Sequence, residues 1–188
     1  MIKVNLGCGE SRRDGFINLD WKPSLNPDIL HDLNKFPYPF EDSTIDYIEA
    51  SHIIEHLDKP FNAFKELHRI LKPGGKLMVK VPHFSRGLTH TEHTHGFDVT
   101  LPLFFNKNFV KSAYIGFEFE LEKMELHWFP FLHCLPHLGY GKLFTLIIRI
   151  FDRMISYFAN LNHYFCSRIW CYWVGGFDEI EFHFICKK

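Results

Sequence analysis

In Val4-Asn5-Leu6-Gly7-Cys8-Gly9-Glu10 a short apolar run enters a loop with two glycines, and Asp20 follows eleven residues after Gly9. Glycine permits backbone conformations and a close ligand approach that a side chain would prevent. In α/β proteins such a loop lies at the carboxyl end of the first strand, where a parallel sheet binds a nucleotide-like cofactor. The stretch therefore predicts an α/β fold with a site for an adenosine-containing cofactor at one edge of its sheet.

The overall composition is that of a globular protein. The chain has 188 residues, of which 46% are hydrophobic and 23% are charged, so residues 1–188 suit one domain with a sizeable core. The formal net charge of -1 provides no broad cationic surface, which argues against a nucleic-acid partner. The 21 phenylalanines indicate either a core filled with large rings or a surface for an apolar substrate or membrane.

Cysteine usage and hydropathy indicate the compartment. The five cysteines are odd in number and contain no C-x-x-C pair, so they do not form the framework of a small disulfide-rich protein. Met1-Ile2-Lys3 leads directly into the first apolar run, without the apolar core of a signal peptide. No stretch reaches the roughly 18 uninterrupted apolar residues of a membrane span. We therefore expect cytoplasmic localisation, no export signal and no transmembrane segment.

Strand and helix signals alternate in the first half of the chain, as in a parallel sheet covered by helices. The predicted strands cover residues 4–6, 16–19, 28–31, 45–50 and 76–81. Apolar residues recur at helical spacing over residues 60–71, with Pro60 suited to the first turn. Lys72-Pro73-Gly74-Gly75 ends this helix, because proline cannot continue the ladder and glycine accepts a left-handed turn.

The second half predicts a histidine-rich loop over residues 83–100, a helix over 106–114, and strands over 117–128 and 180–186. An insertion over residues 129–176 separates these two strands, and its centre is an amphipathic helix. The apolar stripe of that helix contains Leu143, Phe144, Ile147, Ile148, Phe151, Met154, Ile155 and Phe158. We interpret the stripe as core packing or a homodimer face; the alternatives are an apolar or lipid-linked acceptor and a membrane surface.

The spacing of the glycine loop argues against a dinucleotide. The fingerprint G-x-G-x-x-G requires a third glycine, where this chain has Arg12, and an acid roughly 20 residues on. Residues 7–15 must contain the whole connection between the first two strands, so the first helix can be little more than a turn. A nicotinamide or flavin site is therefore disfavoured.

Residues 3–83 instead resemble the class I S-adenosylmethionine-dependent methyltransferases. Gly7 and Gly9 match that family's cofactor loop, and Asp20 matches the acid that holds both ribose hydroxyls. The resemblance implies a three-layer Rossmann-like α/β sandwich with a mostly parallel seven-stranded sheet, order 3-2-1-4-5-7-6, whose last strand is antiparallel, and with a helical insertion between strands six and seven. It also implies that residues 1–83 bind the cofactor and that residues 84–188 hold the acceptor.

Further segments match the family in order. His31-Asp32-Leu33 resembles the adenine-binding loop, residues 45–52 resemble the fourth strand and its exit, and residues 66–75 resemble the helix and turn before strand five. In the adenine-binding loop Asp32 would accept from the amino group, and Leu33 or Trp21 would cover a ring face. The residues that the resemblance assigns to S-adenosylmethionine are Leu6, Gly7, Cys8, Gly9, Asp20, Trp21, Asp32, Leu33, Ser51 and His52.

The resemblance implies O- or N-methyl transfer to a small-molecule acceptor. Methyl transfer from a sulfonium is an in-line displacement, so positioning supplies most of the rate and a base serves only to remove an acceptor proton. Histidine suits this role near neutral pH. We assign it to His52 and His83, which follow strands four and five and would flank the methyl group in the resembling fold.

Two other functions remain open. The first is a non-catalytic protein of the same fold that binds S-adenosylmethionine. The second is a metal-dependent hydrolase, because His52-Ile53-Ile54-Glu55-His56 matches H-x-x-E-H, and on a helix both histidines would share one face. A related E-x-x-E-H segment binds a divalent metal in ubiquinone-type O-methyltransferases, and the cluster His90, His93 and His95 would add ligands. We nevertheless assign no metal site.

Overall fold

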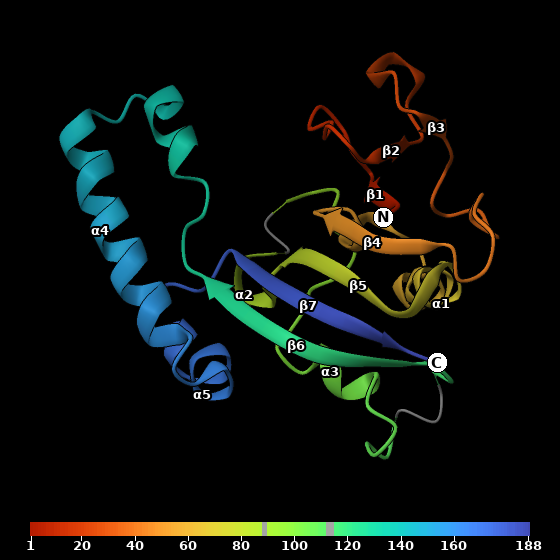
Figure 1. Ribbon diagram of the computed structural model, residues 1–188. Coiled ribbons are helices and arrows are strands. Elements are labelled where there is room, and N and C mark those ends of the chain that lie inside the picture. Colours follow the sequence, from red (N-terminus) through yellow and green to blue (C-terminus); the bar gives the residue numbers. More distant parts are fainter. Residues whose placement is uncertain (88–89, 112–114) are drawn as a thin grey trace.

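The computed structural model describes residues 1–87, 90–111 and 115–188, and its centre is one seven-stranded sheet (Figure 1). The strand order is β3-β2-β1-β4-β5-β7-β6, in which the antiparallel β7 lies between β5 and β6. This confirms the predicted order and the direction of the last strand. The strands are β1 Lys3–Leu6, β2 Ile17–Asp20, β3 Ile29–Leu30, β4 Ile45–Ser51, β5 Leu71–Pro82, β6 Glu118–His127 and β7 Glu179–Lys187.

The connection between β1 and β2 contains no helix within residues 7–16, all of which the structure describes. Two asparagines hold it instead. The Asn5 side-chain amide donates to the Ser11 carbonyl at 2.9 Å and to Asn18 Oδ1 at 3.0 Å, and Asn18 Oδ1 also accepts from the Arg13 amide at 2.8 Å. Because these bonds satisfy backbone groups that a helix would satisfy, the short crossover closes without one.

Helices α1 (Pro60–Ile70), α2 (Phe84–Gly87) and α3 (Leu101–Phe104) lie behind the sheet in Figure 1. Aromatic rings fill the space between these helices and the strands. The Phe105 ring centroid lies 4.8 Å from that of Phe64 in α1, 5.6 Å from that of Phe119 in β6, and 5.5 Å from that of Phe184 in β7. Many of the phenylalanines are therefore core residues, as one of the two interpretations of their abundance expected.

The opposite face of the sheet has a different character. Lys80, Glu181 and His183 lie on it, each half-buried, and alternate along their strands with fully buried residues such as Val79 and Phe182. We expected helices on both faces, as in a three-layer sandwich. In the described ranges α1, α2 and α3 share one face, and the facing side has a network of charges instead (Figure 1).

Apart from shifts of one residue at element ends, the elements differ from the predictions in three places. The loop predicted over residues 83–100 begins with the short helix α2, Phe84–Gly87. β5 begins at Leu71 and not at residue 76, because Leu71 pairs with Ile45 ahead of an irregularity in the register. The helix predicted over 106–114 is wrong for residues 106–111, which form turns, and residues 112–114 lie outside the described part. The Asn106 side chain accepts the Asn108 amide at 2.9 Å, a local turn that competes with helix formation.

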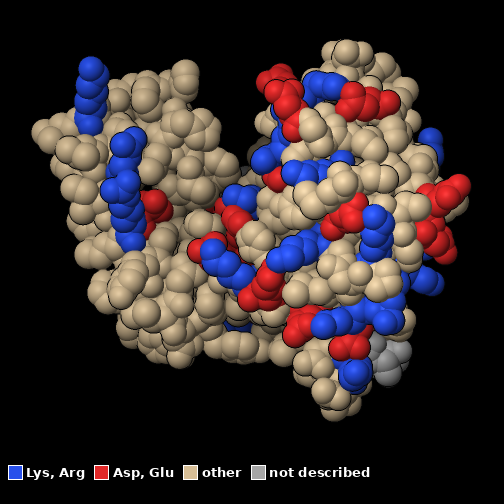
Figure 2. All heavy atoms as spheres, in the orientation of Figure 1, with Lys and Arg blue, Asp and Glu red and all other residues tan. Residues whose placement is uncertain are grey.

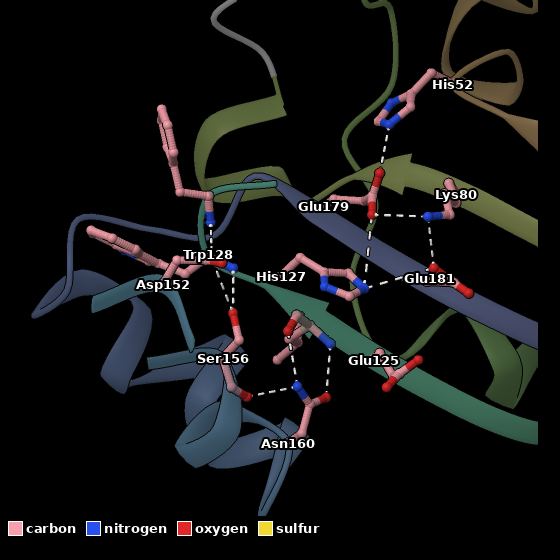
Figure 3. Close-up of polar contacts among 12 residues, drawn as sticks. His52, Lys80, Glu125, His127, Trp128, Asp152, Ser156, Asn160, Glu179 and Glu181 are labelled. Atoms are coloured by element: carbon pink, nitrogen blue, oxygen red, sulfur yellow. Dashed lines mark hydrogen bonds and ion pairs between the residues drawn. The ribbon is translucent and has the colours of Figure 1, made fainter. Parts of the chain in front are cut away.

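The insertion contains a 3-10 helix, Leu132–Leu138, followed by α4, Lys142–Ala159, and α5, His163–Arg168. α4 lies beside the edge strand β6, and its polar side chains satisfy backbone amides at the end of that strand. Asp152 accepts from the Phe129 amide at 2.9 Å, and Ser156 accepts from the Trp128 amide at 3.0 Å. Asn160 follows at the same four-residue spacing, and its Oδ1 accepts from the Leu126 amide at 2.9 Å (Figure 3).

This arrangement turns the polar stripe of α4 towards the sheet and the apolar stripe outwards. Of the eight apolar residues that formed the predicted stripe, Ile155 alone is buried. Core packing of the stripe was therefore the wrong interpretation. The physical reason is the edge strand, whose unpaired amide groups require acceptors more strongly than the apolar residues require burial. Among the described residues, no helix is both long enough and apolar enough to span a membrane.

Candidate active site

The two glycines of the loop after β1 have different structural roles. Gly7 has φ +63°, and a Cβ atom there would lie 2.5 Å from Ile53 Cγ1, so the close approach of Ile53 requires glycine. Gly9 has φ +51°, and nothing lies within 4 Å of the position of its Cβ. The space beside Gly9 is therefore open on a backbone conformation suited to glycine, as a cofactor loop requires.

Asp20 ends β2 beside this loop. It is buried, its Oδ2 accepts from the Gly9 amide at 2.9 Å, and its Oδ1 accepts from the Lys22 amide at 3.0 Å. An ionised carboxylate offers about four acceptor positions, so two bonds to amides leave capacity for two hydroxyl groups. The structure thus brings Gly9 and Asp20 together in an arrangement that fits the ribose of an adenosine-containing cofactor.

The other predicted cofactor residues differ in how accessible they are to a ligand. Trp21 is 67% exposed next to Asp20, so its ring is available to cover a base. Asp32 accepts from the Asn34 amide at 3.0 Å and stays partly exposed. Leu33 is buried in the hydrophobic core, and its carbonyl accepts from the Tyr38 hydroxyl at 3.0 Å. The Leu33 side chain therefore has no face available for an adenine ring.

Leu6 and Cys8 are also buried. The Cys8 amide donates to the Leu19 carbonyl at 3.0 Å, which joins the loop to β2. Burial, followed by the nearby Asp20 carboxylate, raises the pKa of the Cys8 thiol. Cys8 is thus a neutral thiol that packs under the loop. Ser51, at the end of β4, is half-buried and leads directly to His52.

His52 lies between two buried carboxylates, those of Glu55 and Glu179, and Figure 3 shows its contact with Glu179. Its backbone has φ +51°, and its Nε2 lies 2.7 Å from Glu179 Oε2, while its Nδ1 lies 3.3 Å from Glu55 Oε1. Burial opposes the charged ring, yet the hydrogen bond to Glu179 and the ion pair with Glu55 outweigh it and raise the pKa of His52 to about 9. At neutral pH His52 is therefore mostly an imidazolium.

Glu179 connects His52 to a charge network on the open face of the sheet (Figure 3). Lys80 lies 3.6 Å from Glu179 and 2.8 Å from Glu181, and His127 Nε2 lies 3.8 Å and 3.7 Å from the same two carboxylates. Burial raises the pKa of Glu179, but the hydrogen bond from His52 and the charges of Lys80 and His52 lower this pKa by more, so the net shift is downwards. Glu179 is ionised and stabilises the imidazolium.

Sequence reasoning missed this network. The signal that would have found it is the alternation of ionisable and apolar residues in β7. Glu179, Glu181 and His183 alternate there with Ile180 and Phe182. A strand with one apolar face and one face of ionisable side chains presents those groups together on one side of a sheet. His52, which directly follows β4, is 127 residues away from Glu179 along the chain, so the pairing itself required the tertiary structure.

His83 is placed differently from His52. It is fully buried, its Nδ1 lies 2.7 Å from Ser85 Oγ, and its Nε2 lies 2.8 Å from Ser167 Oγ. Burial lowers the pKa of His83 to about 4, so the ring is neutral. Because both ring nitrogens are occupied by hydroxyls and the ring has no exposed surface, this geometry suits a role in packing between α2 and α5.

The H-x-x-E-H segment does not form the helix that the hydrolase alternative requires. His52 has a left-handed backbone, and only Ile54–His56 is helical, as a single 3-10 turn. His52 is held by Glu179, whereas Glu55, His56 and His93 each place a ligand atom within 4.8 Å of the others. The loop that contains His93 is fixed here by Thr94, whose hydroxyl donates to the Glu55 carbonyl at 2.9 Å.

A seven-stranded sheet of this order, with a glycine loop and a carboxylate at the ends of β1 and β2, defines a Rossmann-like domain for an adenosine-containing cofactor. Residues 20–79 match the family model of a methyltransferase domain. The chain is also similar to the ubiquinone/menaquinone biosynthesis C-methyltransferase UbiE of Ruegeria sp. (strain TM1040), with 46% identity over 41 residues. That aligned segment is 22% of this chain and 16% of the relative's length.

Solved structures share the fold over nearly the whole chain. An S-adenosylmethionine-dependent methyltransferase from Archaeoglobus fulgidus matches with 15% identity and a TM-score of 0.58, covering 97% of this chain and 85% of that one. Another from Mesorhizobium loti matches with 13% identity and a TM-score of 0.56, covering 98% and 90%. Residues 20–79 therefore match a methyltransferase domain, and the chain shares its fold with these S-adenosylmethionine-dependent methyltransferases.

Proposed function

We propose that this domain transfers a methyl group from S-adenosylmethionine to an oxygen or nitrogen of a small-molecule acceptor. The observation that carries the proposal is the pairing of Gly9 with Asp20 next to the exposed ring of Trp21. S-adenosylmethionine, when bound, supplies an electrophilic methyl group on a sulfonium. Asp20 would accept from the ribose hydroxyls, Trp21 would cover the adenine, and Asp32 would accept from its amino group.

His52 is the residue that we propose removes the acceptor's proton. Both ring nitrogens face carboxylates, but in the neutral form one of them carries no proton and can accept one, and Glu55 and Glu179 stabilise the imidazolium that results. Because these carboxylates raise the pKa of His52 to about 9, the neutral form is a minority at neutral pH. Methyl transfer should therefore speed up as the pH rises towards about 9. We propose a packing role for His83, in view of its buried, doubly bonded ring.

A carbon acceptor is the second candidate. The matching relative from Ruegeria is named as a C-methyltransferase. Its 41-residue match to this chain supports a carbon acceptor. A carbon nucleophile also benefits from a base at the position of His52, so the two candidates use the same residue. Analysis of the methylated product by mass spectrometry and NMR distinguishes methylation on oxygen, nitrogen and carbon.

The first test is a calorimetric titration with S-adenosylhomocysteine. We expect micromolar binding by the wild type and at least a tenfold loss for Asp20→Asn, since charge-assisted hydrogen bonds contribute about 1.5–3 kcal/mol each. Asp14→Asn is the matched control, because Asp14 is exposed in the same loop. Absence of binding by the wild type would contradict both the methyltransferase and the non-catalytic cofactor-binding protein.

The second test separates those two functions. A panel of hydroxyl, amine and enolisable acceptors is assayed with the wild type and with His52→Asn. Loss of a general base lowers turnover roughly 100-fold or more while S-adenosylhomocysteine affinity is retained. Turnover that His52→Asn leaves unchanged would refute the base, and a well-bound cofactor with no transfer to any acceptor would favour the non-catalytic alternative.

A further inference from the structure

The exposed apolar side chains of this protein are concentrated on the insertion. Among the described residues, most of the large hydrophobic side chains that are exposed lie between Phe131 and Trp173. They occur on α4, on the 3-10 helix before it and on the segments after it. Those on α4 are Leu143, Phe144, Leu146, Ile147, Ile150, Phe151, Met154, Tyr157 and Phe158. A soluble monomer seldom exposes so many neighbouring apolar groups without a binding partner.

The orientation of α4 keeps this surface turned away from the sheet. Asp152, Ser156 and Asn160 are bonded to the end of β6, so the opposite side of the helix faces outwards. On that side Leu143 is 72% exposed and Ile150 is 59% exposed. Figure 2 shows the result as a lobe that is almost free of charged groups, beside a body on which both signs of charge are crowded.

The few charges of the insertion are nearly all positive. Within residues 129–176 Lys142, Arg149, Arg153 and Arg168 are basic and Asp152 is the single acid, whereas the whole chain has a formal charge of -1. Arg168 pairs with Asp98 at 3.0 Å, outside the insertion. In the described part of the chain no ion pair is formed by the remaining three cations, and at 100° per residue all three lie on one flank of α4.

We propose that this surface, the outward face of α4 together with the exposed aromatic residues Tyr172 and Trp173 of the same insertion, binds the interface of a bilayer that contains anionic phospholipids. An apolar face inserts below the headgroups while a cationic flank contacts their phosphates, as in other interfacial helices. Tyr172 is 68% exposed and Trp173 is 73% exposed, and such rings favour the boundary between water and hydrocarbon. The cations of α4 attract the negative headgroups of an anionic bilayer. A second copy of this chain would present the same cations and repel them, so charge complementarity favours the bilayer as the binding partner.

Membrane binding would place the candidate active site near the lipid. Figure 2 shows a hollow between the apolar lobe and the body of the molecule. The insertion also contacts the site directly, because the ring centroid of Phe131 lies 5.8 Å from that of His52. The docking surface does not depend on the proposed chemistry, since the groups that form it lie outside the cofactor loop. Its test therefore uses lipid binding and not turnover.

The test is co-sedimentation of the full chain with vesicles. One set contains phosphatidylcholine alone, and the other contains about a third phosphatidylglycerol. We expect binding to the anionic vesicles that weakens with salt, and at least a tenfold loss for the double variant Ile150→Gln, Met154→Gln. Leu30→Gln is the matched control, because Leu30 is 58% exposed but lies in β3. Circular dichroism and thermal melting verify that the variants fold.

A second pair of variants tests the charge. Arg149→Gln with Arg153→Gln should remove the preference for anionic vesicles, whereas Lys59→Gln with Lys65→Gln, on or next to α1, should retain it. Equal binding to both vesicle types by the wild type would overturn the electrostatic part of the proposal. Failure to bind either type would overturn it entirely, as would a dimer in light scattering that Ile150→Gln, Met154→Gln dissociates and that excludes vesicles.

Discussion

Replacement of His52 by asparagine should remove a pH-dependent part of the protein's stability. The backbone of His52 has φ +51°, a left-handed conformation that asparagine tolerates better than most residues. His52→Asn therefore removes the titrating ring without forcing the backbone to change. Glu55 and Glu179 lose the cation that they share, so the variant should be less stable than the wild type near neutral pH.

The magnitude follows from the pKa of His52, which rises from the ordinary value of 6.5 to about 9 on folding. A group whose pKa is raised by folding stabilises the folded state fully below its unfolded pKa, and loses this stabilisation as the pH rises through its folded pKa. Linkage between these two values gives a loss of about 2.5 kcal/mol between roughly pH 7 and pH 10. Most of that loss falls between about pH 7 and pH 9.

The assay is urea unfolding of the wild type and His52→Asn at several pH values across this range. Other groups titrate there too, but they do so in both proteins, so the difference in the free energy of unfolding isolates His52. We expect that difference to be largest near neutral pH and to shrink by about 2.5 kcal/mol at the alkaline end. Parallel curves for the wild type and His52→Asn would refute the assignment of a raised pKa.

Two further predictions concern the glycine loop and the buried histidine. Gly7→Ala should lower the free energy of unfolding by about 3 kcal/mol or more, because the added Cβ would overlap Ile53. Gly9→Ala should lower it by about 1 kcal/mol through backbone strain alone and should mainly weaken S-adenosylhomocysteine binding. Equal losses of stability in urea unfolding would contradict the different roles of the two glycines. His83, whose pKa is lowered to about 4, stabilises the fold fully above its ordinary value of 6.5 and progressively less as the pH falls, so His83→Gln should reduce the wild type's loss of about 2 kcal/mol between pH 7 and pH 5. Identical acid unfolding of the two proteins would show that His83 is not the titrating group.

The local parts of the fold were open to prediction because short-range rules govern them. Pro60 in the first turn and the sequence after Ile70 determine where α1 begins and ends. The number of residues between Gly9 and Asp20 determines that the first crossover is a turn. The helix expected over residues 106–114 failed for residues 106–111, because Asn106 makes a local side-chain bond that a periodicity argument does not weigh.

The candidate site also has one part that the sequence predicts and another that only the tertiary structure explains. Gly9 and Asp20 are eleven residues apart, and the Gly9 amide donates directly to the Asp20 carboxylate, so the motif alone predicts this pair. Glu179 meets His52 only because the antiparallel β7 inserts next to β5, which brings a strand from the end of the chain to the exit of β4. The carboxylates of Glu179 and Glu55 then keep His52 charged, whereas burial keeps His83 neutral, although the two residues occupy similar places after neighbouring strands.

The sequence by itself determined the glycine loop and the presence of an amphipathic helix in the insertion, because each depends on spacing within a short segment, whereas the expected sheet order came from the family resemblance. The direction in which that helix faces was decided only by the tertiary structure. Amphipathicity shows that one side is apolar, but not which side meets the protein. At α4 the backbone amides at the end of β6 donate to Asp152, Ser156 and Asn160. These hydrogen bonds hold the polar side of the helix against the strand, so the apolar side faces outwards.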